Sequence, residues 1–190
     1  MSILRPLPNM TIVAPCDAVE MENFMKKSIN WPHPIYIRIA KGGDEIVSRQ
    51  DLGFEIGKAI ELEEGKDLLL VSTGIMTQRA LRLREELQSN GISSSVLHFH
   101  TLKPMDVSAL LKNSEDKQLI VTMEEHSRIG GLGSAVLETL NDFANNSMPP
   151  VKRFGLPDQF AKNYGSQDKL MESHGLTVDL LTKSILKSLK

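Results

Sequence analysis

Short hydrophobic runs alternate with helical stripes along most of this chain. Strands are predicted where the runs are continuous, at DLLLVS (67–72), SVLHFH (95–100), QLIVTM (118–123) and VKRFGLP (151–157). Helices are predicted where apolar residues recur every three or four positions, as at 76–87, 136–143 and 178–189, and a short helix is expected from Asp106. Strands that alternate with helices predict an α/β fold of three layers, α/β/α, around a mostly parallel sheet.

The first 43 residues show a separate, smaller pattern. TIVA (11–14) and PIYIRIA (34–40) predict two strands, and Asp17 with Glu20 three positions later predicts the start of a helix between them. Two strands and one helix are too few for a stable sheet of their own. We therefore predict three parts: a partial α/β segment that ends a preceding domain (1–43), a polar linker (44–52) and the three-layer domain (53–190).

Composition and charge narrow the class of protein. Hydrophobic residues make up 41% of the 190 residues and charged residues 24%, with a net charge of −2, as in an ordinary globular protein. The charges form no basic stripe, so we expect neither a nucleic-acid nor a membrane partner. The apolar runs are too short to span a bilayer, and the start of the chain lacks the pattern of a secretory signal. The single cysteine, Cys16, excludes an internal disulfide framework and predicts a cytoplasmic location.

A glycine turn lies between a predicted strand and a predicted helix in VTMEEHSRIGGLGSAVLETL (121–140). Its glycines are Gly130, Gly131 and Gly133. Such a turn can bind phosphate through the free N–H groups and dipole of the helix that follows. Here, however, the spacing is G-G-x-G, which matches neither nucleotide-binding motif, and Glu124 and Glu125 would repel an anion. We favour a structural interpretation, in which the small residues let the helix pack closely against the sheet.

The other candidates for chemistry are histidines, a cysteine and a lysine. His98 and His100 alternate onto one face of a strand, but no third metal ligand is predictable nearby, so we favour a polar strand face and expect no metal site. His126 beside two carboxylates could act as an acid or base, although the sequence offers neither a nucleophile nor a pocket. Cys16 is expected to be a packed thiol, and Lys41, at the end of a strand, could contact an anionic substrate group.

Several segments, in order along the whole chain, resemble the transketolase superfamily. Two are similar to the end of its pyrimidine-binding domain, RPLPNMTIVAPCDAVE (5–20) and PIYIRIAKG (34–42). Others are similar to its C-terminal domain, HTLKPMD (100–106), EEHSRIGGLGSAVLE (124–138), FGLPDQFAKNYG (154–165) and LMESHGLT (170–177). Together these matches are specific, and they assign the glycine turn to a transketolase C-terminal domain instead of a nucleotide site.

The resemblance implies an enzyme that uses thiamine diphosphate and a divalent metal such as magnesium. In that family, a glutamate of the pyrimidine-binding domain activates the cofactor, and a G-D-G motif of another domain binds the metal and the diphosphate. That glutamate would lie before Met1, and G-D-G occurs nowhere in this sequence. We therefore expect no catalytic residue and no bound cofactor in this chain alone, and ketol transfer only together with the remaining domains or an N-terminal subunit.

The resemblance also implies an assembly role and one substrate contact. The family's C-terminal domain mainly supports the dimer, so we expect a homodimer in which the motif residues mark the domain and its interface: Glu124, Glu125, His126, Gly130, Gly131 and Gly133. In transketolases and in 1-deoxy-D-xylulose-5-phosphate synthase, the strand that closes the pyrimidine-binding domain ends in R-x-x-R, and the second arginine helps to hold the substrate phosphate. Here these positions are Arg38 and Lys41. Lysine keeps the charge but lacks the bidentate fork, so we expect weakened phosphate binding by Lys41 and a mainly structural Arg38.

Two classes of function remain open. The first is the C-terminal section of a transketolase-like enzyme, which transfers a two-carbon ketol unit between sugar phosphates. Split transketolases are the preferred parent, followed by 1-deoxy-D-xylulose-5-phosphate synthase and then the beta subunit of a 2-oxo acid dehydrogenase. The second class is a non-catalytic protein-binding module. An exposed apolar patch around 3–14 would favour the first class, and a compact monomer with a well-packed 1–43 segment the second.

Overall fold

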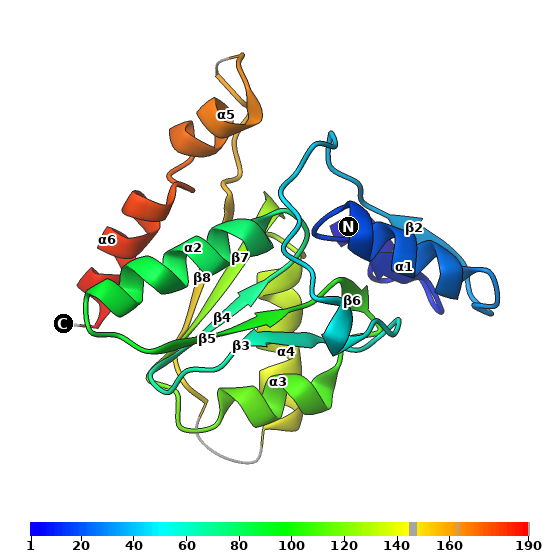
Figure 1. Cartoon of the computed structure of the whole chain (residues 1–190), viewed down its shortest axis with the longest axis horizontal. Helices are drawn as coiled ribbons and strands as arrows, with labels where there is room; N and C mark the ends of the chain where they lie inside the picture. Colours follow the sequence, from blue (N-terminus) through cyan, green and yellow to red (C-terminus); the bar gives the residue numbers. More distant parts are fainter. Residues whose placement is uncertain (145–147, 163, 190) are drawn as a thin grey trace.

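The structure is a computed structural model that describes residues 1–144, 148–162 and 164–189. Within these residues the strands are β1 (Thr11–Val13), β2 (Ile35–Ile37), β3 (Ile60–Glu63), β4 (Leu68–Ser72), β5 (Ser94–His98), β6 (Thr101–Lys103), β7 (Leu119–Ser127) and β8 (Val151–Leu156). The α-helices are α1 (Ala18–Ser28), α2 (Met76–Ser89), α3 (Val107–Ser114), α4 (Leu132–Phe143), α5 (Gln167–Ser173) and α6 (Val178–Ser188) (Figure 1). Two 3-10 helices, at Ser2–Leu4 and Gln50–Leu52, complete the regular structure of the described residues.

The main sheet has the strand order β3-β5-β4-β7-β8. Its central pairs are parallel, with Leu70 opposite both Val96 and Val121, and β3 joins one edge in the antiparallel direction. All five residues of β4 are buried, because helices cover both faces of this strand. The predicted α/β fold with a mostly parallel sheet is therefore confirmed.

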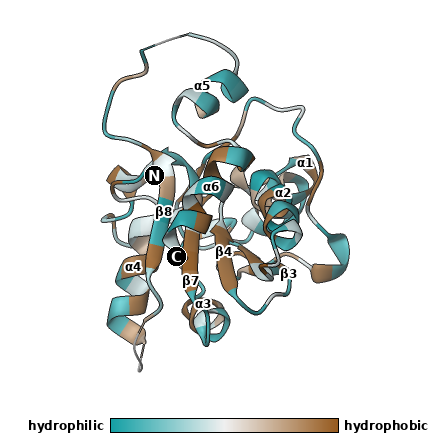
Figure 2. Ribbon diagram, turned by 90° about the vertical axis from the view of Figure 1, so that its left-hand side faces the viewer, coloured by the Kyte–Doolittle hydropathy of each residue, from teal (hydrophilic) through white to brown (hydrophobic). Residues whose placement is uncertain are grey.

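Helices cover the two faces of the main sheet in separate layers. Leu68 and Leu70 pack into a hydrophobic cluster with α2 and α6, whereas Leu69 and Val71 pack into another cluster with α3 and α4. The alternation follows from the two-residue period of a strand. In Figure 2 the hydrophobic strands β4 and β7 lie between helices with many hydrophilic residues, as the three-layer prediction requires.

The N-terminal segment forms a second, smaller sheet with a strand of the larger domain. The strand order is β2-β1-β6, in which β1 is parallel to β2 and antiparallel to β6. The core of this sheet is shared, because Ile12 packs with Phe99 and Leu102, while Val13 packs with Phe24 of α1. The two sheets and α1 lie side by side in Figure 1.

Several sequence-based expectations differ from the structure in detail. The strand predicted at 34–40 is shorter, since β2 ends at Ile37. The sequence pattern predicts neither helix α5 nor the contribution of β6 to the N-terminal sheet. Residues 3–14, where an exposed apolar patch would favour the enzyme section over the binding module, are mixed: Ile3 is 88% exposed, whereas Ile12 is fully buried. None of the described helices is long and apolar enough to cross a membrane.

Candidate functional site

The glycine turn after β7 is filled from within the chain. Glu124, fully buried at the end of β7, accepts hydrogen bonds from the N–H groups of Leu132 at 2.8 Å and Gly133 at 2.9 Å. These are the free donors at the start of α4 that a phosphate would use. The carboxylate also complements the positive end of the helix dipole. The turn is thus a helix cap, in which the Glu124 carboxylate takes the place that a phosphate ligand would occupy.

The glycines of the turn are required by close approach. A Cβ atom at Gly131 would overlap Oε2 of Glu124. A Cβ atom at Gly133 would lie 2.7 Å from both the Arg153 side chain and Oγ1 of Thr122. Gly130 has a φ of 71°, in the left-handed region that favours glycine. The small residues therefore bring α4 against β7 and β8.

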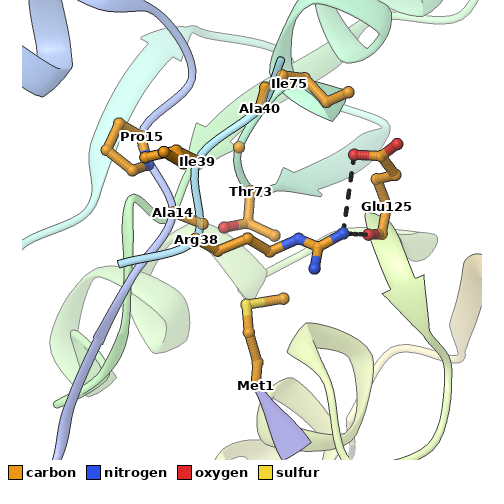
Figure 3. Close-up of a pocket in the computed structure, with 10 residues that line it drawn as sticks. Met1, Ala14, Pro15, Arg38, Ile39, Ala40, Thr73, Ile75 and Glu125 are labelled. Carbon is orange, nitrogen blue, oxygen red and sulfur yellow. Dashed lines mark hydrogen bonds and ion pairs between the residues drawn. The ribbon is translucent and has the colours of Figure 1, made fainter. Parts of the chain in front are cut away.

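Arg38 and Glu125 join the N-terminal segment to the carboxyl end of β7. One Nη of Arg38 donates a 2.6 Å hydrogen bond to the backbone carbonyl of Glu125 and lies 3.8 Å from its carboxylate (Figure 3). Gln167, at the start of α5, donates a 2.7 Å hydrogen bond to the same carboxylate. Arg38 is therefore engaged in joining chain segments.

Lys41 is placed differently from Arg38. Arg38 lines a hollow with Thr73 and Glu125 that has a volume of about 20 Å³, room for roughly one water molecule. Lys41 is exposed, and the residues flanking it, Ala40 and Gly42, line a second hollow of about 140 Å³. The two hollows adjoin each other, since Pro15, Ile39 and Ala40 line both, and Lys41 itself lines neither. Among the described residues, Lys41 has no hydrogen-bond or ion-pair partner.

Neither hollow fits thiamine diphosphate. Both are smaller than the roughly 300–1,000 Å³ of ordinary small-molecule sites. The smaller one lies at the start of α2, lined there by Thr73, Gly74 and Ile75, and the chain contains no G-D-G sequence. The residues present therefore do not form a complete site for this cofactor.

His126 follows the two glutamates on β7 and is partly buried. Its Nδ1 lies 2.9 Å from the Ser127 carbonyl oxygen and 3.6 Å from Oε2 of Glu124. The imidazole thus borders the same cap that Glu124 provides. No nucleophile lies among its described contacts. The geometry therefore favours a structural role for His126 over a role as an acid or base.

His98 and His100 are both buried, which the prediction of a polar strand face did not specify. The ring of His98 is held on both sides: Nε2 lies 3.0 Å from the Glu20 carboxylate, and Nδ1 lies 2.7 Å from Oγ1 of Thr77. Burial alone would raise the pKa of Glu20, but the facing His98 and the Cys16 N–H hold it below its usual value. Burial lowers the pKa of His100 to about 4, which keeps that ring neutral at pH 7.

Sequence reasoning missed the pairing of Glu20 with His98. The two residues are 78 positions apart, and the local pattern indicates Glu20 only as a helix residue after the Asp17 cap. That cap is present, since Asp17 accepts a 2.9 Å hydrogen bond from the Glu20 N–H. The Glu20 carboxylate, however, accepts from the Cys16 N–H at 2.6 Å and turns inward to His98.

Comparisons with known proteins agree with this fold. The family described as transketolase, C-terminal domain, matches residues 57–180. The chain is 34% identical over 190 residues to an apulose-4-phosphate transketolase subunit of Phocaeicola vulgatus, and covers 59% of that protein. It is 35% identical over 187 residues to 1-deoxy-D-xylulose-5-phosphate synthase of Prochlorococcus marinus, which is 97% of this chain and 29% of the synthase.

Solved structures give the same relationship. A structure described as a split-gene transketolase in an inactive beta4 tetramer is 37% identical, with a TM-score of 0.90, over 99% of this chain and 60% of that one. A transketolase from Pichia stipitis, at 18% identity and a TM-score of 0.71, shares the fold. The chain thus spans about 60% or less of the length of these relatives. Because the family match covers most of its residues, the chain belongs to the transketolase family and contains that family's C-terminal domain.

Proposed function

We propose that this chain is the C-terminal section of a thiamine-diphosphate-dependent, transketolase-type enzyme that transfers a two-carbon ketol unit between sugar phosphates. The observation that carries the proposal is the likeness to a split-gene transketolase, which extends over 99% of the chain at 37% identity. Thiamine diphosphate and magnesium would be bound by the complete enzyme. The remaining domains, or an N-terminal subunit, would supply the residues that activate the cofactor.

The geometry of the N-terminal segment supports this role. In the described part of the chain, β2 has a strand neighbour on one side only, so its other edge is open for pairing. Ile39, two residues after β2, is 70% exposed. An open edge followed by an exposed apolar side chain fits contact with the remainder of a pyrimidine-binding domain.

We assign Lys41 to the substrate phosphate and Arg38 to the support of the site. Lys41 is exposed beside a hollow and carries an unneutralised charge, as a phosphate contact requires. Arg38 holds the strand that leads to Lys41 against the end of β7. The complete enzyme would assemble as a homodimer in the cytoplasm, with the motif at 124–133 near the domain contacts.

A cofactor titration tests this function. Calorimetry with thiamine diphosphate and magnesium should show no saturable binding to the chain alone and one site when the remaining transketolase sections of the same organism are added. A separate measurement of the molecular mass of the assembled enzyme in solution tests whether it is a homodimer. If the mixed sections neither associate nor bind the cofactor, the proposal is refuted, and the non-catalytic module, which the burial of β1 favours, becomes the better account.

A further inference from the structure

Three side chains capable of binding a metal meet inside the molecule, away from the glycine turn. Cys16 precedes α1, Glu20 lies in its first turn, and His98 ends β5. Each of them offers one ligand atom, and these three atoms all lie within 4.8 Å of one another. All three residues are 1% exposed. The cluster therefore joins the N-terminal segment to the main sheet at a fully buried point.

The three residue types of this cluster are all ones that can bind zinc. Thiolate sulfur, imidazole nitrogen and carboxylate oxygen are the ligand types that Zn²⁺ takes in proteins. A buried carboxylate also requires a compensating positive charge, and Nε2 of His98 is the nearest ring nitrogen to Glu20, at 3.0 Å. A cation at this point would compensate the Glu20 charge and bind the thiolate of Cys16.

The surroundings of the cluster also resemble those of a metal site. Nδ1 of His98 lies 2.7 Å from Oγ1 of Thr77, the kind of outer hydrogen bond that orients a ligating imidazole. Oγ1 of Thr77 is in turn 3.0 Å from Oγ of Ser72. This chain of contacts fixes the ring with Nε2 directed toward Glu20.

A buried ring nitrogen without a partner and a small hollow both lie next to the three residues. Nε2 of His100 is buried without a hydrogen-bond partner among the described residues, and the His98 and His100 ring centroids are 5.9 Å apart. The hollow of about 140 Å³ is lined by Cys16. Neither Glu20 nor His98 lines this hollow, so it adjoins the cluster at Cys16 alone, with room for a water molecule there.

We propose that Cys16, Glu20 and His98 bind one Zn²⁺ ion, which fastens α1 to the end of β5. Binding would release the thiol proton of Cys16 to solvent, because the thiolate is the ligand form. The proposed site is structural and separate from ketol transfer. Its test is therefore independent of the test of the proposed function. The competing arrangement is a metal-free cluster, with a Glu20–His98 pair beside an inert thiol.

Metal titration of the full chain distinguishes the two arrangements. The protein is treated with a chelator, exchanged into chelator-free buffer and titrated with Co²⁺, while absorption is recorded for sulfur-to-cobalt charge transfer. We expect saturation at one equivalent, loss of the cobalt spectrum when Zn²⁺ is added, and a higher unfolding temperature in the presence of Zn²⁺. The unmodified chain alone decides this part, so no variant has to fold for the test to succeed.

Variants then locate the site. Cys16→Ser should abolish the charge-transfer band, and His98→Asn should weaken binding by more than the roughly 10- to 100-fold that an outer contact is worth. Thr77→Val should fall within that roughly 10- to 100-fold range, because it removes only the outer contact. His33→Asn, at an exposed histidine, is the matched control and should bind like the unmodified chain.

Two results would overturn the proposal. One is the absence of saturable Co²⁺ or Zn²⁺ binding by the chelator-treated chain, which would establish the metal-free cluster. The other is unchanged affinity and an unchanged spectrum in folded Cys16→Ser and His98→Asn proteins, which would place any bound metal elsewhere.

Discussion

The guanidinium of Arg38 donates a 2.6 Å hydrogen bond to the backbone carbonyl oxygen of Glu125. This contact joins the chain after β2 to the carboxyl end of β7, two segments that are 87 positions apart. It connects the two sheets at the side of the molecule where Lys41 is exposed.

Replacing Arg38 should therefore reduce stability. Arg38→Met removes a charged donor to a partly buried carbonyl, and we expect a loss of about 1.5–3 kcal/mol in the free energy of unfolding. Urea denaturation of the chain measures this loss. The control is Arg49→Met, since the Arg49–Asp51 ion pair is exposed to solvent and its loss should change stability little. Equal losses of unfolding free energy in the two variants would show that the contact of Arg38 with Glu125 does not stabilise the fold.

The cap at α4 should not tolerate a side chain at Gly131. Gly131→Ala places a methyl group on the Glu124 carboxylate, and we expect a loss of about 1–3 kcal/mol in the free energy of unfolding from the forced shift. Gly165→Ala is the matched change at an exposed glycine, where the nearest atom to the added methyl is 3.3 Å away on Lys169. Chemical denaturation of both variants should separate them clearly, and a neutral Gly131→Ala would contradict the described cap.

Asp106 should make part of the stability dependent on pH. Burial opposes ionisation of this carboxyl, but hydrogen bonds from Ser108, Ala109 and Ala59 outweigh it and hold its pKa below the ordinary value. A lowered folded pKa means that the contribution is complete above the unfolded pKa of about 3.9 and is lost as the pH falls through the folded pKa.

Asp106→Ala tests this dependence. We expect a loss of about 0.5–2 kcal/mol at neutral pH, as for other helix caps. The difference from the unmodified chain should shrink as the pH is lowered below the unfolded pKa of about 3.9. Thermal unfolding across pH measures it, and Asp158→Ala at an exposed position serves as the control. A difference that stays constant with pH would exclude the proposed contribution of the ionised carboxyl.

Lys41 is the residue whose replacement should affect activity without affecting stability. In the reconstituted enzyme, Lys41→Ala should lower kcat/KM for phosphorylated sugars by roughly 10-fold or more, the effect of losing a charged hydrogen bond. Lys41→Arg should retain or improve it, because arginine adds a bidentate fork. Steady-state kinetics with Lys27→Ala, another exposed lysine, as the control would show whether the effect is specific.

Much of the main domain could be predicted because its signals are local. The stripe of Met76, Ala80, Leu83 and Leu87 on α2 is fully buried, as its helical spacing predicts. The continuous run at β4 is likewise buried on both faces. In contrast, Phe143 at the end of α4 is 55% exposed, although it continues the apolar stripe of the buried Val136 and Leu140.

The remainder depends on contacts between distant positions, for which the sequence holds no local signal. The pairing of β6 with β1 involves strands of three residues each, too short to show a period of their own. The meeting of Glu20 with His98 depends on how the N-terminal segment packs against the main sheet, and the cap by Glu124 depends on how α4 returns to β7. In each case the sequence shows which residue types are present, but it does not show which distant residues they contact.

A mixing titration tests the proposal as a whole. Ketol transfer between sugar phosphates is measured while the chain is added to a fixed amount of the remaining transketolase sections, with thiamine diphosphate and magnesium present. We predict no activity from either component alone and a rise that saturates at equimolar chain. Activity of the chain by itself, or activity of the other sections that does not change when the chain is added, would contradict the account.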